Sequence, residues 1–547
     1  MDIMKPFFLF LSILTFVQSV HKAASNSSPL ENFLQCLSNH SLPSNPTSNA
    51  IYTPNNSSFL SILHMHTYNH RFSAPSAPKP LAIVTALHES HVQGTVTCAK
   101  YNGLQIRIRS GGHDTEGLSY VSDVPFIILD MFNLNSVDVD IANGTTWVQA
   151  GATLGKVYYN IAEKSKVHGF PAGVCSTLGS GGHFSGGGYG NLMRKYGLSV
   201  DNIIDAQLVD VNGKILDRKS MGEDLFWAIR GGGGASFGVI LSWKIKLVQV
   251  TPMVTVFKVK KTVEEGATDV VYKWQLIATE LPEDLYIRAM PEVVNGTQSG
   301  KKTVQVTFIG LFLGQSDKLL PLLNESFPEL GLLQSDCIEM PWVNSTLYWY
   351  SFPIGTPIEA LLDVPKEPTS NNFKTMSDYV KKLIPKTALA SIWDFMIRSE
   401  SVRMEWNPYG GKMHEISPSE TPFPHRAGNL FLIEYLTSWG EDGVEAKSHY
   451  LNISSAFYQF MTPYVSNSPR EAFLNYRDLN IGANLPSNAT SMDIARIYGS
   501  KYFRGNFERL MSVKFKVDPE NFFRNEQSIP CKKICCVILN DKCKSHI

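Results

Sequence analysis

Short apolar runs and amphipathic stretches alternate near the beginning of the chain. Residues 81–85 form a β-branched run, the stretch from there to about Tyr101 has apolar residues at helical spacing, and residues 104–109 alternate as a strand does. This order predicts a strand, a helix and a second strand. The second strand runs directly into the Ser-Gly-Gly-His sequence of residues 110–113, so we expect that loop to leave the carboxyl end of a strand.

Further strands are predicted where apolar residues are continuous or alternate with polar ones. In the first half of the chain these are residues 126–129, 146–150 and 236–247. Between about residues 255 and 435 the strands become longer, as at 304–310 and 430–436, and helical patterns separate them. This second pattern predicts an α+β domain built on one large antiparallel sheet.

Composition and charge narrow the class of protein. A chain of 547 residues is long enough for two or three domains with sizeable cores, and its hydrophobic fraction of 43% is ordinary for a globular protein. Lys plus Arg and Asp plus Glu both number 49. This balance argues against a nucleic acid or an anionic membrane as the main partner, and we expect a monomer that acts on a small molecule.

The N-terminus has the pattern of a secretory signal peptide. Lys5 precedes the apolar run of residues 7–17, which is followed by small residues at 23–25 and is too short for a good membrane span. We expect a mature protein that is soluble and either extracellular (apoplastic) or vacuolar. A secretory route agrees with the many Asn-x-Ser/Thr sequons, at Asn26, Asn39, Asn55, Asn56, Asn143, Asn295, Asn324, Asn344, Asn452 and Asn488.

Two glycine clusters each carry a nucleophilic side chain. The first is the loop at 110–113 with His113, and the second follows Cys175, where seven of the twelve residues 179–190 are glycine. Glycine lets the backbone approach a ligand without interference from a Cβ atom. Neither cluster has the spacing of a dinucleotide-binding turn or a P-loop. The pair therefore predicts a large phosphate-bearing cofactor that is held covalently.

These motifs resemble those of the plant berberine bridge enzyme-like flavoproteins, and the resemblance runs from about residue 30 to residue 530. Within that family the chain is most similar to the cannabinoid-synthase branch. The matching segments are residues 109–114, the Cys175 segment, and residues 188–198, 224–234, 475–478 and 521–530.

The resemblance implies an α+β fold. It consists of a two-lobed FAD-binding domain of the vanillyl-alcohol-oxidase type and a substrate domain whose large antiparallel sheet is flanked by helices. The implied divisions are a signal peptide at 1–25, the FAD-binding domain at 26–252, the substrate-binding domain at 253–451, a C-terminal segment at 452–530 that returns to the FAD domain, and an atypical Cys-rich tail at 531–547.

The family's cofactor is FAD, and the resemblance implies attachment at two points, through His113 and Cys175. A histidine nitrogen and a thiolate can each attack an electrophilic flavin carbon. Main-chain amides would bind the pyrophosphate, and two residues at the start of a strand would approach the flavin. These expected contacts are Ser110, Gly111, Gly112, Gly181, Gly182, His183 and Ser185 for the pyrophosphate, and Gly238 and Val239 for the flavin. Arg109 is either a phosphate contact or a strand-end charge. Leu178 stands three residues after the flavin cysteine, where relatives with leucine react slowly with oxygen.

Three residues are candidates for the chemistry. Glu434 lies in an otherwise apolar strand, so its carboxylate is either paired and structural or faces a cavity with a raised pKa; it matches the acidic base of berberine bridge enzymes. Tyr476 matches a base proposed in cannabinoid synthases, or it is an aromatic wall that donates one hydrogen bond. Strand alternation puts Arg288 and Met290 on one face, where Arg288 either binds a substrate oxygen or is solvated.

The resemblance also suggests pocket-lining residues and a disulfide. We expect Thr115, Tyr196, Met290 and Tyr409 to line the substrate site. Thr115 replaces a tyrosine that is frequent in alcohol-oxidising members, which counts against a monolignol-type site. Cys36 and Cys98 match a family disulfide, and Cys337 is expected to be a buried free thiol. The cysteines of the tail lack zinc-ligand spacing, so no metal is expected.

The leading functional prediction is a secreted FAD-dependent oxidoreductase. It would move hydride from a benzylic or allylic carbon of a prenylated phenolic substrate to flavin N5, with desaturation or ring closure; molecular oxygen is a candidate electron acceptor. A redox-neutral cycloaddition on the same scaffold is an alternative, compatible with Leu178, Thr115 and Arg288. A carbohydrate oxidase is a third, against which the apolar and aromatic character of the site strands counts. A flavin-binding defence protein without catalysis is the fourth.

Overall fold

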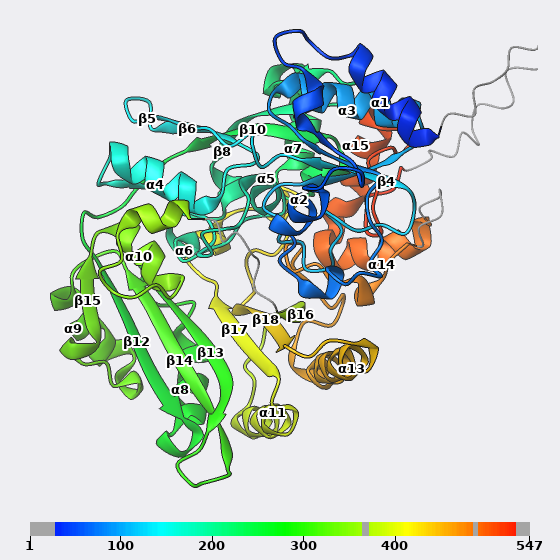
Figure 1. The fold of residues 1–547 in the computed structure, drawn as a ribbon. Helices are drawn as coiled ribbons and strands as arrows, with labels where there is room; N and C mark the ends of the chain where they lie inside the picture. Colours follow the sequence, from blue (N-terminus) through cyan, green and yellow to red (C-terminus); the bar gives the residue numbers. More distant parts are fainter. Residues whose placement is uncertain (1–27, 364–370, 485–490, 532–547) are drawn as a thin grey trace, which may run out of the picture.

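The computed structural model describes residues 28–363, 371–484 and 491–531. The predicted signal peptide and the tail beyond Cys531 lie outside these residues. Figure 1 shows two lobes: the N-terminal half of the chain builds one, a long sheet builds the other, and the last helices return to the first. The predicted α+β fold is confirmed.

The first lobe begins with a four-stranded sheet in the order β1-β2-β4-β3. β2 and β3 run parallel to β4, and β1 runs antiparallel to β2. The predicted strand–helix–strand unit is present, with β4 inserted between its two strands. The elements are α1 (Pro29–Asn39), β1 (Ile51–Tyr52), α2 (Phe59–Met65), β2 (Ala82–Thr85), α3 (Glu89–Tyr101), β3 (Gln105–Arg109) and β4 (Phe126–Asp130).

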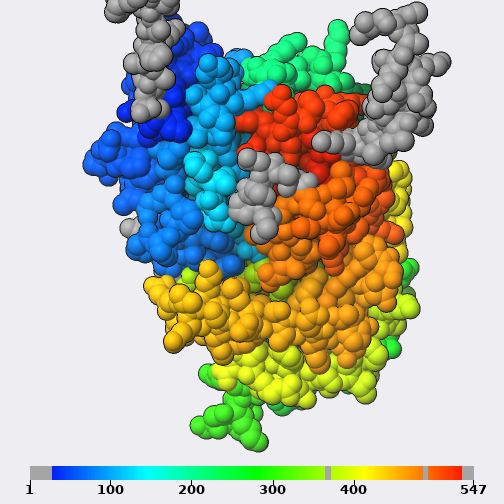
Figure 2. All heavy atoms as spheres, turned by 90° about the vertical axis from the view of Figure 1, so that its right-hand side faces the viewer, coloured from blue at the N-terminus to red at the C-terminus, as the bar shows by residue number. Residues whose placement is uncertain are grey.

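A five-stranded antiparallel sheet in the order β5-β6-β10-β8-β9 completes this lobe. Its elements and their neighbours are β5 (Val137–Asp140), β6 (Thr145–Gln149), α4 (Leu154–Lys164), β7 (His168–Gly169), α5 (Ser180–Ser185), α6 (Met193–Tyr196), β8 (Ile203–Val209), β9 (Ile215–Leu216), α7 (Arg218–Ile229), β10 (Val239–Lys246) and β11 (Val248–Gln249). The C-terminal helices α14 (Met492–Phe503) and α15 (Phe507–Val517) pack beside this lobe, with α15 against α7. Figure 2 shows these late segments in contact with the N-terminal ones.

The second lobe is a seven-stranded antiparallel sheet in the order β15-β12-β14-β13-β17-β18-β16, which confirms the large sheet. Its strands are β12 (Val254–Thr262), β13 (Leu285–Asn295), β14 (Lys302–Phe312), β15 (Cys337–Met340), β16 (Asn372–Val380), β17 (Val402–Pro408) and β18 (Phe431–Trp439). Its helices are α8 (Ala267–Ile277), α9 (Ser316–Ser326), α10 (Trp342–Trp349), α11 (Lys386–Ser399), α12 (Lys412–Glu415) and α13 (Val444–Phe460). Among these, α8, α11 and α13 pack on the sheet's central and edge strands.

One predicted domain boundary needs correction. The division between residues 451 and 452 falls inside α13, a continuous helix that packs on β18 and β16. A boundary within a helix would split one hydrogen-bonded unit, so α13 belongs with the sheet. The division after residue 252 falls between β11 and β12 and stays a prediction.

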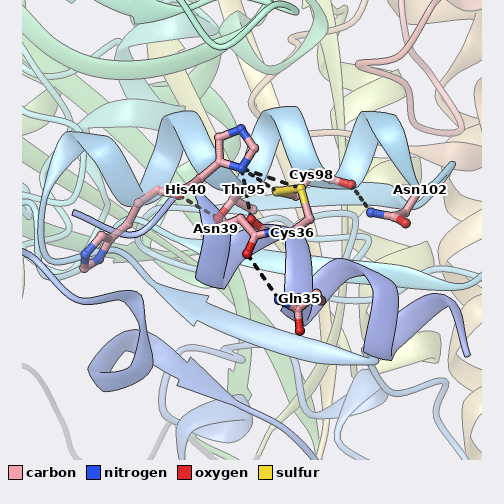
Figure 3. The surroundings of a disulfide bond; sticks show 8 residues. Gln35, Cys36, Asn39, His40, Thr95, Cys98 and Asn102 are labelled. Atoms are coloured by element: carbon pink, nitrogen blue, oxygen red, sulfur yellow. Dashed lines mark hydrogen bonds between the residues drawn. A yellow bond between two sulfur atoms is a disulfide. The ribbon is translucent and has the colours of Figure 1, made fainter. Parts of the chain in front are cut away.

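The predicted disulfide joins Cys36 of α1 to Cys98 of α3, with an S–S distance of 2.01 Å (Figure 3). The Nδ1 atom of His40 lies 3.7 Å from the Cys36 sulfur and 3.6 Å from the Cys98 sulfur. These three residues are the one group of close metal-type ligands among the described residues. Because both sulfurs are consumed by the disulfide, we assign no metal there.

Two other described cysteines outside the cofactor site are free thiols. Cys337 is free as predicted but is half-buried rather than buried, and its thiol donates to the Leu333 carbonyl at 3.6 Å. Cys531 donates to the Asp518 carbonyl at 3.0 Å. Within the described parts of the chain, no helix combines the length and the apolar character that crossing a bilayer requires.

Candidate active site

The glycine-rich segments of the first lobe line a pocket that is open to solvent and has about 1200 Å³ of empty space, the solvent at its mouth included. Most of the predicted cofactor-binding residues meet there. Those that line it are Ser110, Gly111, Gly112, His113, Leu178, Gly181, Gly182, His183, Ser185 and Gly238. The C-terminal segment closes the pocket with Asn475, Arg477 and Gln527, which the sequence analysis did not assign to it.

The pocket walls fit a large phosphate-bearing cofactor such as FAD. Gly112 has φ +73°, and a Cβ there would lie 2.0 Å from the His66 carbonyl oxygen, so only glycine fits. A Cβ at Gly182 would meet no atom within 4 Å and would stand in the pocket space itself. The main-chain N–H groups of Gly111, Gly112 and His113 donate to no other group of the described chain, which leaves them available to an anion.

The two nucleophile candidates are joined by a threonine. A hydrogen bond of 2.9 Å connects His113 Nε2 to Thr177 Oγ1, and the same oxygen lies 3.4 Å from Cys175 Sγ. Burial lowers the pKa of His113 to about 4, so the imidazole is neutral near pH 7 and one ring nitrogen keeps its lone pair. The ring of Tyr68 stacks on His113 with centroids 3.9 Å apart.

Residues from the second lobe reach this nucleophile pair. Tyr350, just after α10, lies close to Cys175 and Thr177, and burial together with Cys175 raises the pKa of its hydroxyl to about 12. His113 and Cys175, the candidate attachment residues, therefore lie where the two lobes meet. No motif in the sequence pointed to Tyr68, Thr177 or Tyr350 as site residues; only Thr177, two residues after Cys175, carried a local signal.

His183 and Leu178 complete the wall near the cysteine. His183 Nε2 accepts a hydrogen bond of 2.9 Å from the Gly173 N–H, and burial followed by the nearby His113 lowers the pKa of His183 to about 3. The Asn475 side chain donates to the His183 carbonyl at 2.9 Å. Leu178 lines the pocket, and its predicted effect on oxygen stays a prediction.

Two expected cofactor contacts have other roles. Arg109 is fully buried, and its Nε and Nη2 donate to Asp130 Oδ2 at 2.9 and 2.6 Å. It is therefore the strand-end charge, and the phosphate-contact interpretation is wrong. The side chain of Val239 packs into the hydrophobic cluster between the two sheets of the first lobe, whereas Gly238 and Ile240 form the pocket wall.

The candidate catalytic side chains lie on the sheet of the second lobe. Glu405 of β17 pairs directly with Glu434 of β18 in the antiparallel register, so both carboxyl groups are on one face. Arg288 of β13 donates to Glu405 Oε2 at 2.6 Å and to Asn407 Oδ1 at 2.7 Å. Arg288 is only 5% exposed. The interpretation as a solvated arginine is wrong, and the guanidinium is already committed to protein groups.

Glu434 and Tyr476 are in contact, as a shared role in the site requires. Burial followed by the charge of Glu405 raises the pKa of Glu434 to about 8, and the hydroxyl of Tyr476 lowers it in part. The Tyr476 hydroxyl is also hydrogen-bonded to that of Tyr189. Burial and Glu434 raise the pKa of Tyr476 well above its usual value. A tyrosinate is therefore costly here, and Tyr476 acts as a hydrogen-bond donor.

Two residues expected to line the substrate site do not do so. The Thr115 hydroxyl donates to the Arg477 carbonyl at 2.9 Å and so fastens two chain segments together. The Tyr196 hydroxyl donates to the Gln249 carbonyl, beside β11 rather than at the pocket. Each hydroxyl is held by a main-chain carbonyl, because these residues tie loops to one another.

Of the other two, Tyr409 has a different role, and Met290 stays a prediction. Tyr409 is 1% exposed and packs edge-on against Tyr379, with ring centroids 5.9 Å apart, so it belongs to the core. Met290 is half-buried on the face that carries Arg288. That face also presents Glu405 and Glu434, and the expected apolar character of the site strands is therefore wrong.

Comparison with known proteins identifies the family of this site. Residues 80–218 match a family described as FAD binding domain, and residues 472–530 match one described as berberine and berberine like. Berberine bridge enzyme-like 4 of Arabidopsis thaliana is 56% identical over 525 residues, which are 95% of this chain and 98% of that protein. Berberine bridge enzyme-like 3 of the same plant is 57% identical over 501 residues, 91% of this chain and 93% of that protein.

Solved structures give the same result. BBE-like 28 from Arabidopsis thaliana has a TM-score of 0.84 and 46% identity, and the match covers 92% of this chain and 99% of that one. Phl p 4, described as a grass pollen allergen with glucose dehydrogenase activity, has a TM-score of 0.85 and 42% identity over 91% of this chain and 99% of its own. The placement near the cannabinoid-synthase branch stays a prediction. The chain belongs to the berberine bridge enzyme-like family of FAD-dependent oxidoreductases.

Proposed function

We propose that this protein oxidises a hydroxyl-bearing carbon of a small molecule, with Glu434 as the proton acceptor. The observation that carries the proposal is the cluster of Glu434, Tyr476 and Tyr189, next to Asn475 and Arg477 of the cofactor pocket. In this cluster the two tyrosine hydroxyls are hydrogen-bonded to each other and Tyr476 interacts with Glu434. FAD, when bound, accepts the hydride equivalent that leaves the carbon. In its ionised form Glu434 takes the hydroxyl proton, and Tyr476 orients the substrate oxygen by donating a hydrogen bond.

A carbohydrate is the substrate class that the charged face supports best. The carboxyl groups of Glu405 and Glu434 on one face of the sheet, with the hydroxyls of Tyr476 and Tyr189 near Glu434, offer several hydrogen-bonding groups, as recognition of a polyhydroxylated ligand requires. The glucose dehydrogenase activity of the similar Phl p 4 agrees with this class. A prenylated phenol is the second candidate, because Tyr68 and Tyr350 supply aromatic surface at the junction of the lobes.

A redox-neutral cycloaddition has less support from the structure than it had from the sequence. It would use Arg288 as a cation that polarises a carbonyl group, but that guanidinium is bound to Glu405 and Asn407. We therefore place this reaction behind both oxidations.

The cofactor attachment that we propose uses both His113 and Cys175. It is supported by the neutral imidazole of His113 and by the Thr177 hydroxyl, which lies within reach of both side chains. The groups that would hold the rest of FAD are the free main-chain amides of residues 111–113 and the glycine-rich pocket wall around Gly182. We call this wall, formed by Gly179, Gly181, Gly182 and Gly186, the glycine cradle. Acid precipitation tests the attachment, because covalently bound flavin stays in the pellet.

Secretion is also a proposal, supported by the pattern of the N-terminal residues and by the Cys36–Cys98 disulfide, which persists in oxidising compartments. Extracellular and vacuolar destinations both fit. We further propose a monomer in which oxygen access is limited by Leu178.

Anaerobic mixing of the purified holoprotein with sugars and with prenylated phenols tests the function. Flavin absorbance and product mass are followed together. Bleaching accompanied by a product two hydrogens lighter supports oxidation and names the substrate class. An unbleached flavin with a product equal to two combined reactants would replace oxidation with cycloaddition.

A further inference from the structure

Two carboxyl groups face each other across neighbouring strands, β17 and β18, of the seven-stranded sheet. Glu405 of β17 is the direct register partner of Glu434 of β18, two strands that lie side by side in Figure 1. Directly opposed side chains on one face of an antiparallel pair have Cβ atoms roughly 4.5–5.5 Å apart. Like charges at such a position repel, so one of the two carboxyl groups favours its protonated form.

The nearby cation is not shared equally between them. Arg288 donates to Glu405 at 2.6 Å and is held in that orientation by Asn407, which also accepts from the Tyr286 hydroxyl at 2.8 Å. The guanidinium further lies over the ring of Trp349 at 5.4 Å. These contacts fix Arg288 on Glu405, so Glu405 is the ionised member of the pair.

The other groups that face Glu434 do not compensate. Arg403 of β17 is exposed to solvent, so its lowering effect on the pKa of Glu434 is screened and is smaller than the raising effect of Glu405. Tyr476 from the C-terminal segment and Tyr189 from the loop before α6 are neutral hydroxyls. Opposite Glu434 on β16 stands Ser377, which does not titrate.

We propose that Glu405 is a positioning residue whose ionised carboxylate delays the ionisation of Glu434, so that β17 sets the pH at which the site gains its proton acceptor. This inference rests on the proposed function, in which ionised Glu434 takes the substrate proton. Below the transition Glu434 keeps its own proton and serves as a hydrogen-bond donor. Above it the same carboxylate becomes the base. Glu405 needs no contact with the substrate for this effect.

A test independent of turnover follows the carboxyl group of Glu434 by infrared spectroscopy. Its protonated carbonyl band is assigned by its loss in Glu434→Gln and is titrated in the holoprotein without substrate. In the unaltered protein the midpoint is expected near 8. In Glu405→Gln it should fall by roughly one pH unit or more, because the like charge is gone and Arg288 is released.

Two variants separate charge from structure. Glu405→Asp keeps the charge and should keep a midpoint close to that of the parent. Glu292→Gln removes a partly exposed carboxylate from the same sheet face. The register of β13 and β17 sets Glu292 opposite Arg403, away from Glu434, so this variant should leave the midpoint unchanged. If Glu405→Gln does not fold, Glu405→Gln with Arg288→Gln removes the ion pair together and avoids an uncompensated buried cation. That double variant should still lower the midpoint, because Glu405 affects Glu434 more than Arg288 does.

The pH dependence of flavin reduction by substrate is then compared with the titration. A band midpoint that is equal in Glu405→Gln and the parent overturns the inference. If the band midpoint falls in Glu405→Gln but the pH profile of flavin reduction does not move, the coupling between the two carboxyl groups is supported. Glu434 is then not the base of the reaction. The two ideas therefore fail separately.

Discussion

Arg477 forms an ion pair with Asp114, its Nε lying 3.3 Å from Oδ2. The pair joins the residue after Tyr476 to the residue after His113, and the Thr115 hydroxyl adds a hydrogen bond to the Arg477 carbonyl. A candidate cofactor-attachment residue and a candidate catalytic residue, more than 300 positions apart in the sequence, are thus fastened through their immediate neighbours. The placement of one side chain depends on that of the other.

A buried lysine reinforces this junction. Lys374 of β16 donates to Asp478 at 2.5 Å and also to Glu116, and all three side chains are less than 5% exposed. Lys374→Met takes the cation away from buried Asp478 and leaves buried Glu116 with Arg71 alone, at 3.4 Å, so the free energy of unfolding should fall by about 3–5 kcal/mol. Denaturant unfolding measures this. Lys386→Met, which breaks an exposed pair with Asp269, should change it by about 0–1 kcal/mol.

The threonine between the two nucleophiles predicts a defect in cofactor attachment. Thr177→Val removes the hydroxyl that contacts His113 and Cys175, so the fraction of doubly attached flavin should fall well below that of the parent. Flavin absorbance after acid precipitation and the mass of the flavin peptide report it. Thr177→Ser keeps the hydroxyl and should behave as the parent; equal attachment in the valine variant would show that the bridge is unnecessary.

Substitutions in the catalytic group should slow the chemical step to different degrees. Glu434→Gln removes the proton acceptor, and flavin reduction should slow by about 100-fold or more. Tyr476→Phe removes an orienting donor and should cost roughly tenfold, since one neutral hydrogen bond is lost. Stopped-flow absorbance measures both rates. Tyr196→Phe serves as the control, because its hydroxyl bonds to the Gln249 carbonyl; a rate as high in Glu434→Gln as in this control would contradict the assignment.

The raised pKa of Glu434 also predicts how stability changes with pH. The folded-state pKa of about 8 exceeds the value near 4.3 of an unfolded chain, so the folded state binds the proton more tightly. The resulting stability is present at low pH and is lost as pH rises towards 8. The parent should therefore lose stability relative to Glu434→Gln between pH 5 and pH 8. Urea unfolding at both pH values checks the sign; a parallel change in the two proteins would exclude it.

The glycine cradle predicts a loss of cofactor without a loss of fold. Gly182→Ala places a methyl group in the pocket space, so flavin content after purification should fall while the melting temperature of the flavin-free protein stays the same. Gly440→Ala is a suitable control, because a Cβ there also meets no atom within 4 Å but lies away from the pocket. Full flavin content in Gly182→Ala would mean that the cofactor avoids this wall.

Local patterns in the sequence predicted the fold to the extent that each element is encoded locally. The run at 81–85, the helix to Tyr101 and the strand at 104–109 correspond to β2, α3 and β3. The same patterns do not encode strand order. No local signal therefore indicated that β4 lies between β2 and β3. The large sheet was predictable as a class, but not the register that sets Glu405 opposite Glu434.

The candidate site was predictable where a motif carried it and not where a contact did. His113, Cys175 and the glycine cradle stand in recognisable segments, and the structure brings the cradle and His113 to one pocket. Tyr68 and Tyr350 reach that place from other parts of the chain, and no pattern in their own segments indicates it. Arg109 shows the opposite error. Its place beside a motif suggested a phosphate contact, but its guanidinium is bound to the buried Asp130.

The link between Cys36 and Cys98 closes a loop that spans 62 positions and contains Tyr68. A protease that cuts the exposed turn at residues 54–57 would leave both fragments covalently joined. Tyr68, whose ring stacks on His113, would stay connected to the rest of the lobe through the chain that follows it. Such a nicked chain would migrate as a single species until a reductant is added. Intactness on a non-reducing gel is therefore no measure of an uncut backbone in this protein.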